Sequence, residues 1–130
     1  MKQIIVIAED RPGLAADVSA ALADAGVNIE TLTAEAMGSV MVGILTVDKY
    51  DEALRALAAA DFQAFSEDVI VVQLEDRPGE LARVMQRFKD ANINLRSIRF
   101  IRRVGTKAFV ALGTERTREA MELVKDVLVS

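Results

Sequence analysis

The sequence predicts an α+β protein made of two βαββαβ units, each an antiparallel sheet with its helices on one face. Three observations indicate this fold class. The chain repeats itself at a separation of 66 residues, and each half alternates β-branched apolar runs with helically spaced apolar residues. Its length of 130 residues, 52% of them apolar and 28% charged, suits a folded chain with room for two small units.

The repeat is clearest near the start of each half. The pentapeptide Glu-Asp-Arg-Pro-Gly occupies residues 9–13 and again residues 75–79. At the shift of 66, twelve of the 25 positions from 4 to 28 are identical, which is far more than unrelated sequences of average composition share. Farther along, the match fades to pattern, with Leu57 aligned on Leu123.

Each half opens with a short apolar run, Ile4–Ala8 or Val69–Leu74, which predicts a buried strand. A Pro-Gly turn follows, and proline at this place suits the first turn of a helix. The aspartate two residues before each proline is a possible helix cap.

A helix follows the turn in each half. Leu14, Val18 and Leu22 recur at helical spacing in the first half. The equivalent helix in the second half also has apolar residues at helical spacing, Leu81, Val84 and Phe88. Gly26 and Asn92 are predicted to end the two helices as left-handed C-caps.

Two strands joined by a hairpin come next. The segments 27–36 and 93–104 are predicted as the outgoing strands, and 40–47 and 107–112 as the returning strands. A Gly-Ser or Gly-Thr dipeptide lies at each predicted turn.

The last helices are predicted over 51–60 and 116–127, followed by a short fourth strand over 62–65 and, in the second half, by residues 128–130 alone. The order is the split βαβ, ferredoxin-like pattern, with modules at 1–66 and 67–130 and a last strand that is short or missing in the second. The junction lacks a flexible linker, and units of about 65 residues are marginal alone. We therefore expect the modules to be tightly coupled or to dimerise.

The composition excludes much catalytic chemistry. The chain has no Cys, His or Trp, which excludes disulfides, thiolate or imidazole metal sites, and catalysis by Ser-His-Asp or Cys-His. No dense Asp/Glu loop suggests an oxygen-only metal site. We therefore expect a protein that is not an enzyme and needs no metal or cofactor.

The chain ends and the hydropathy bear on location. The first apolar run is too short for a signal-peptide core, and no run approaches the roughly 20 residues of a membrane span. We expect a cytoplasmic protein without a membrane partner. The net charge of −4 argues against general nucleic-acid binding.

Charge is unevenly distributed along the chain. Residues 1–66 carry 4 basic and 10 acidic side chains, whereas residues 67–130 carry 12 and 10. Much of the basic charge lies in one region of the second half: Arg96, Arg99, Arg102, Arg103 and Lys107. A solvated pair of strands is the simpler explanation. A patch for an anionic partner, or for the acidic half of another chain, is the alternative.

The repeated loop between the first strand and the first helix is the candidate site. Helix N-termini offer free N–H groups and a partial positive charge, which suit a carboxylate or a phosphate. Gly13 and Gly79 allow a ligand to approach the backbone, and Asp10 and Asp76 add a negative charge nearby. This combination suits a zwitterion such as an amino acid.

Other residues beside the loop are weaker candidates. Asn28 and Asn94 open the second strand of each half, and their amides are expected near the loop. Arg11 and Arg77 are candidates to contact the ligand, with solvated or ion-paired roles as the alternative. A purely structural role in starting the helix explains the loop from its spacing equally well.

These motifs, Asp-Arg-Pro-Gly before an apolar helix and then Gly-Val-Asn-Ile or Asn-Ile-Asn-Leu, resemble the ACT domain, a βαββαβ module that binds amino acids. The resemblance covers each half and implies a free-standing tandem ACT protein that regulates a partner enzyme or regulator of amino-acid metabolism, with effectors bound at module interfaces. By this resemblance the ligand-binding role falls on Asp10, Pro12, Gly13, Leu14 and Asn28, and on Asp76, Pro78, Gly79, Glu80 and Asn94.

Two features depart from the family pattern. The polar loop position is often Asn in the family and is Asp in both halves here, which favours an ammonium contact. Glu80 stands where the first half has Leu14, so the two sites need not be equivalent.

Two other functions stay open. One is a structural or oligomerising subunit without a ligand. The other is RNA binding, because the RNA-recognition motif has the same element order and residues 107–110, Lys-Ala-Phe-Val, weakly resemble its third-strand motif. The scarcity of aromatic residues argues against RNA binding.

Overall fold

The computed structural model describes residues 2–129, so Met1 and Ser130, the outer ends of the two predicted modules, lie outside the described residues. The chain divides into two compact units, the first spanning Lys2–Glu67 and the second beginning at Asp68. Each unit has its own hydrophobic core.

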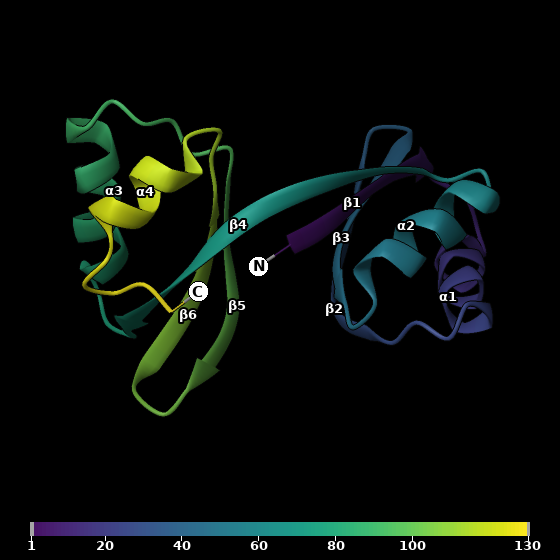
Figure 1. Ribbon diagram of the computed structural model, residues 1–130, viewed down its shortest axis with the longest axis horizontal. Helices are drawn as coiled ribbons and strands as arrows, with labels where there is room; N and C mark the ends of the chain where they lie inside the picture. The colour runs from purple at the N-terminus through teal and green to yellow at the C-terminus, as the bar shows by residue number, and fades with distance from the viewer. Residues whose placement is uncertain (1, 130) are drawn as a thin grey trace. The chain divides into compact units, whose positions relative to one another are not determined.

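The first unit has the predicted βαββαβ order. Its elements are β1 (Lys2–Glu9), α1 (Leu14–Asp24), β2 (Ile29–Met37), β3 (Val40–Val47), α2 (Tyr50–Ala59) and the first part of β4 (Gln63–Glu75). The strands are hydrogen-bonded in the order β2-β3-β1-β4, and β3 is antiparallel to both of its neighbours. Both helices lie on the same side of the strands (Figure 1). They enclose a core of Ile4, Val6, Leu22, Val27, Leu45, Ala53 and Leu57.

The second unit repeats this arrangement. It contains the rest of β4, then α3 (Glu80–Asp90), β5 (Ser97–Val104), β6 (Lys107–Gly113) and α4 (Thr117–Leu123). The strand order is β4-β6-β5, with both pairings antiparallel. The core is made of Ile70, Val72, Leu74, Val84, Phe88, Ile93, Val110, Leu112, Ala120 and Val124. The predicted α+β class with a repeated ferredoxin-like pattern is confirmed.

The end of the chain supplies a short fourth strand for the second unit. Leu128 forms an antiparallel bridge with Val72. The N–H of Gln73 donates to the carbonyl of Val127 at 2.9 Å, and the N–H of Val129 donates to the carbonyl of Val71 at 2.7 Å. The second sheet is thus extended beyond β4 by a segment of its own chain, as the abbreviated strand in the sequence indicated.

The helix ends follow the predicted chemistry. Gly26 and Asn92 have φ angles of 74° and 55°, and both act as left-handed residues after a helix. The N–H of Val27 returns to the carbonyl of Leu22 at 2.9 Å, a Schellman bond. The prediction of these two C-caps is confirmed.

The predicted and observed elements differ at the junction. Two separate strands were expected around residue 66, but Gln63–Glu75 is one uninterrupted strand of 13 residues. No proline or glycine interrupts this stretch, so nothing forces a turn there. The outgoing strands also begin later than predicted, at Ile29 and Ser97, because the residues after each helix form the C-cap loop.

An extra residue changes the alignment of the two halves. The pairing of β5 with β6 shifts register between Phe100 and Arg102, so Ile101 has no counterpart in the first unit. Beyond this bulge the separation of equivalent residues is 67, and Leu57 corresponds to Val124, each fully buried. The alignment of Leu57 on Leu123 is therefore wrong by one residue.

Candidate functional site

The loop after the first strand has the same conformation in both units. Gly13 and Gly79 are the N-cap residues of α1 and α3, with φ angles of 84° and 88°. This left-handed backbone is strained for any residue with a Cβ, which explains why glycine recurs at this place. Each helix begins one residue after the glycine and two residues after the proline.

The first turn of α1 leaves backbone donors free. The N–H of Asp17 donates to the carbonyl of Gly13 at 3.0 Å, and the N–H of Leu14 donates to the carbonyl of Arg11 at 3.3 Å. Within the described chain, the N–H groups of Ala15 and Ala16 have no hydrogen-bond acceptor. These are the donors that a helix N-terminus offers to an anion.

Neither aspartate of the repeated loop caps its helix. No side chain caps α1 or α3, so that prediction is wrong: the glycine takes the N-cap position and the aspartate lies three residues before it. The carboxylate of Asp10 forms no ion pair or hydrogen bond with any described residue. The carboxylate of Asp76 pairs with Arg103 at 3.2 Å. The two loops are therefore alike in backbone and different in charge pairing.

The two loop arginines are both ion-paired. Arg11 bonds to Asp17 at 2.7 Å, on an exposed face. Arg77 donates two hydrogen bonds of 3.2 Å to one oxygen of Glu80, and Arg83 binds the other oxygen at 3.1 Å. The hydrogen bond from Arg83, followed by that from Arg77, holds the pKa of the Glu80 carboxyl below its ordinary value.

The asparagines are not near the loop of their own unit. Ile29 is in register with Val47, at the end of the sheet where β1 begins, whereas Glu9 is in register with Val40. Asn28 therefore lies at the opposite end of the strands from Asp10, about seven residues or 23 Å away along β1. Its N–H donates to Asp48 at 2.8 Å.

Asn94 has the same place in the second unit. It precedes Ser97, which is in register with Gly113 and, through β6, with Val69, the β4 residue farthest from Asp76 in the pairing with β6. The expectation that Asn28 and Asn94 approach the loop of their own unit is wrong, because the outgoing strand starts at the end of the sheet where the first strand begins.

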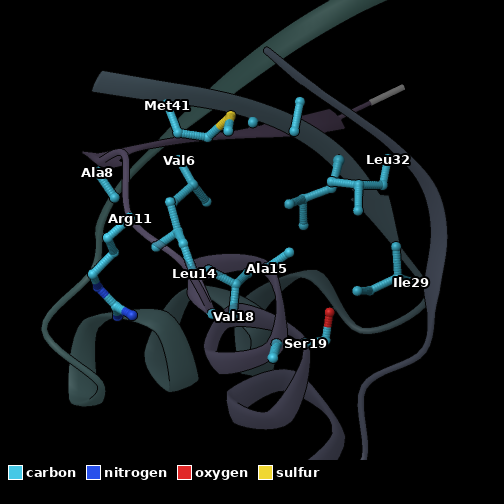
Figure 2. Close-up of a pocket in the computed structure, with 15 residues that line it drawn as sticks. Val6, Ala8, Arg11, Leu14, Ala15, Val18, Ser19, Ile29, Leu32 and Met41 are labelled. Atoms are coloured by element: carbon cyan, nitrogen blue, oxygen red, sulfur yellow. The ribbon is translucent and has the colours of Figure 1, made fainter. Parts of the chain in front are cut away.

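A cavity of about 240 Å³ adjoins the loop of the first unit. Figure 2 shows side chains from the strands and from α1 converging on it. The strands contribute small or flexible residues: Ala8 from β1, Ala34 from β2, and Met41 and Gly43 from β3. These positions were not singled out in the sequence, because an inward-facing alanine or glycine is visible as unusual only once the strand register is known.

The helix and the loop line the other side of this cavity. From α1, the cavity is faced by Leu14, Ala15 and Val18, and by Ser19, which lies one turn beyond Ala15 (Figure 2). The guanidinium of Arg11 and the hydroxyl of Ser19 are the polar side-chain groups in an otherwise apolar lining. Gly13 and Leu14 belong both to the predicted loop site and to the cavity, so the two form one continuous site.

A family comparison identifies the first unit. The model of the ACT domain matches residues 2–62, the range that contains the loop, α1 and the cavity. Residues 2–62 form an ACT domain. A comparison with curated proteins gives no match.

Solved structures resemble nearly the whole chain, beyond the ACT domain itself. Protein BT0572 from Bacteroides thetaiotaomicron covers 98% of this chain, with 90% of its own length, a TM-score of 0.84 and 21% identity. The ligand-free regulatory subunit of aspartate kinase from Thermus thermophilus covers 96%, with 91% of its own length, a TM-score of 0.65 and 25% identity. The corresponding subunit from Thermus flavus covers 96%, with 90% of its own length, a TM-score of 0.64 and 23% identity.

The basic stretch of the second unit is largely engaged in ion pairs. Arg96 binds Glu115 at 3.2 Å, and the ammonium of Lys107 contacts Glu75. The guanidinium of Arg102 lies 5.9 Å from the centre of the Phe109 ring, which is itself half-buried. The ring that was compared with an RNA-recognition motif is therefore partly covered, which weakens the RNA-binding alternative.

Within residues 2–129, no three His, Cys, Asp or Glu side chains gather where they could hold a metal ion. Over the same residues, no helix combines the length and the apolar character needed to cross a membrane.

Proposed function

We propose that this chain is a regulatory protein without catalytic activity of its own, and that it binds an amino acid at the loop between β1 and α1. One observation supports this most strongly. Asp10, whose carboxylate has no partner among the described residues, precedes a helix start whose Ala15 and Ala16 N–H groups are also free. A zwitterion satisfies both, with its ammonium on the carboxylate and its carboxylate on the N–H groups.

The likeness to known proteins supports the regulatory part of the proposal. Residues 2–62 belong to a family of ligand-binding regulatory modules, and the chain is similar to a subunit that is regulatory in aspartate kinase. We propose that the second unit is also an ACT module. The partner is then an enzyme or a regulator of amino-acid metabolism in the cytoplasm, and the protein needs no cofactor other than its effector.

A panel of the twenty amino acids tests this function. The melting temperature of the whole chain is measured with each amino acid, and a ligand at 100 times its dissociation constant adds about 2.7 kcal/mol of stability. Asp10→Ala is expected to abolish the response and keep the fold, because the carboxylate has no hydrogen-bond or ion-pair partner among residues 2–129. Asp76→Ala is the matched variant at the paired aspartate. A folded protein that responds to none of the twenty contradicts the proposal.

A second candidate function is an assembly subunit. Leu32 and Met37 of β2 are 50% and 63% exposed, which is unusual for large apolar side chains on a strand. We propose that the protein is a homodimer, and mass determination in solution with and without the amino acid tests this. Assembly that persists when every amino acid fails to bind favours the structural role.

A further inference from the structure

The two units differ in the size of the side chains at equivalent positions, which the repeat allows to be compared one by one. At five of the positions that line its cavity, the first unit has a small side chain where the second has a large one. Gly43 pairs with Val6 in the first unit, and Val110 pairs with Val72 at the same register in the second. Val110 is fully buried in the second core.

The same change occurs on three further elements. Ala8 of β1 corresponds to Leu74, which is 3% exposed and part of the second core. Ala34 of β2, opposite Gly43, corresponds to the larger Phe100, opposite Val110. The Phe100 side chain is 40% exposed and lies outside the second core.

On the helix, Ala15 corresponds to Leu81 and Ser19 to Met85, and both larger residues pack against the second core. One exchange runs the other way, with Met41 replaced by Ala108. At Leu74, Leu81, Met85 and Val110 the second unit therefore fills with its own side chains volume that the first leaves open.

Gly43 indicates that the open volume is not forced by the backbone. A Cβ added there meets its nearest neighbour, the carbonyl oxygen of Val6, at 3.9 Å, an ordinary contact. The position lies inside β3, away from the register shift near Ile29. A glycine within a strand weakens it and often marks the close approach of a ligand.

We infer that the first unit alone holds the effector, and that the effector is an amino acid with an apolar side chain, which enters the cavity between α1 and the strands. This inference rests on the proposed function and specifies its ligand. The volume of about 240 Å³ suits such a side chain, since an apolar cavity of about 150 Å³ accommodates benzene. The apolar lining disfavours a charged side chain, which loses its hydration there.

The loop contacts fit the same assignment. Asp10 and the free N–H groups lie at the first unit's loop, whereas Asp76 of the second unit is already paired with Arg103. Glu80, which replaces the cavity residue Leu14, brings a carboxylate to the first turn of α3 and binds Arg77 and Arg83 there. The second unit thus has a neutralised loop, and the cavity of about 350 Å³ beside it is lined by charged groups such as Glu75, Glu80 and Lys107, which does not suit an apolar side chain. In this inference the second unit serves as the scaffold.

Calorimetric titration of the whole chain tests the inference. Leucine, isoleucine, valine, methionine and phenylalanine are compared with serine, glutamate and lysine. The expected result is binding of an apolar member with one ligand per chain. Ala34→Phe and Gly43→Val, which copy the second unit, are expected to weaken this binding at least about tenfold. Both variants are checked for folding by thermal unfolding.

Thr33→Phe is the matched control, because the neighbouring residue of β2 points to the opposite face of the strand. It is expected to leave the affinity within about twofold. A polar amino acid as the best ligand, two ligands per chain, or an apolar ligand unaffected by Ala34→Phe and Gly43→Val overturns the inference and leaves the proposed function standing. Failure of all twenty amino acids overturns the proposed function, and the inference with it.

Discussion

Both terminal nitrogens of Arg87, on α3, donate hydrogen bonds to the carboxylate of Asp126, at 2.6 and 3.0 Å. The same guanidinium donates to the carbonyl of Leu123 at 3.3 Å, where α4 ends. The hydrogen bond from Arg87 holds the pKa of the Asp126 carboxyl below its ordinary value. One side chain therefore fixes the segment from which the short last strand of the second unit starts.

Asp126→Asn is expected to lower the free energy of unfolding by about 0.5–1 kcal/mol, since a two-pronged pair on a partly exposed surface is stronger than an isolated one. Denaturation in urea measures the change. Glu122→Gln is the matched control, because its pair with Lys125 is highly exposed and worth little. Equal effects of the two substitutions would contradict this role for Arg87.

The last strand makes a second prediction. Leu128 is half-buried against the second core and bridges Val72. Leu128→Ala is expected to cost about 1–2 kcal/mol, which is below the roughly 2–5 kcal/mol of fully buried leucines because this one is partly exposed. Met121→Ala, at a position of α4 that is 39% exposed and outside the second core, should cost less. Hydrogen exchange of β4 amides is expected to speed up in the leucine variant alone.

Replacing two glycines by alanine is expected to change the stability of the protein in opposite directions. Gly13→Ala is expected to destabilise the protein by about 1 kcal/mol, because an L-residue is strained at a φ of 84°. Gly43→Ala is expected to stabilise it by about 0.5 kcal/mol, because the backbone there is ordinary and a Cβ has room. Thermal unfolding of both variants checks the signs. Stabilisation by both would show that the loop tolerates another conformation.

The lowered pKa of the Glu80 carboxyl predicts that the free energy of unfolding depends on pH. The pKa of this carboxyl is lowered in the folded protein, so its contribution to the free energy of unfolding is fully present above the ordinary pKa of glutamate. That contribution is lost as the pH falls from there through the lowered pKa. Between about pH 5 and pH 3, unfolding free energy should fall less steeply in Glu80→Gln than in the wild type. Glu67→Gln removes a carboxyl group that is outside the described ion pairs and serves as control. Parallel curves for wild type and Glu80→Gln would refute the prediction.

Much of the fold was accessible from the sequence because its signals are local. Apolar spacing marked the helices, and Gly26 and Asn92 marked their ends through a backbone preference. The continuity of β4 was missed because the polar residues around Ser66 resemble a loop, whereas pairing and the lack of glycine or proline keep them extended.

Only part of the candidate site could be predicted from the sequence. The loop was found because its residue types repeat, and the left-handed glycines confirm its geometry. The position of Asn28 depends on strand register, and the cavity depends on which alanines and glycines face inward across three strands. Both are relations between segments distant in the chain, and the one-residue bulge at Ile101 hides the comparison of Gly43 with Val110.

The exposed edge strand has a practical consequence for handling the protein. Among the strands of the described chain β2 is hydrogen-bonded to β3 alone, so its other side offers N–H and C=O groups that can template a strand from another molecule. Glu30 and Glu35 are the charges that discourage such growth. Near the isoelectric point of about 4.9 repulsion between molecules is weakest, so concentrated stocks should precipitate or form fibrils most readily there.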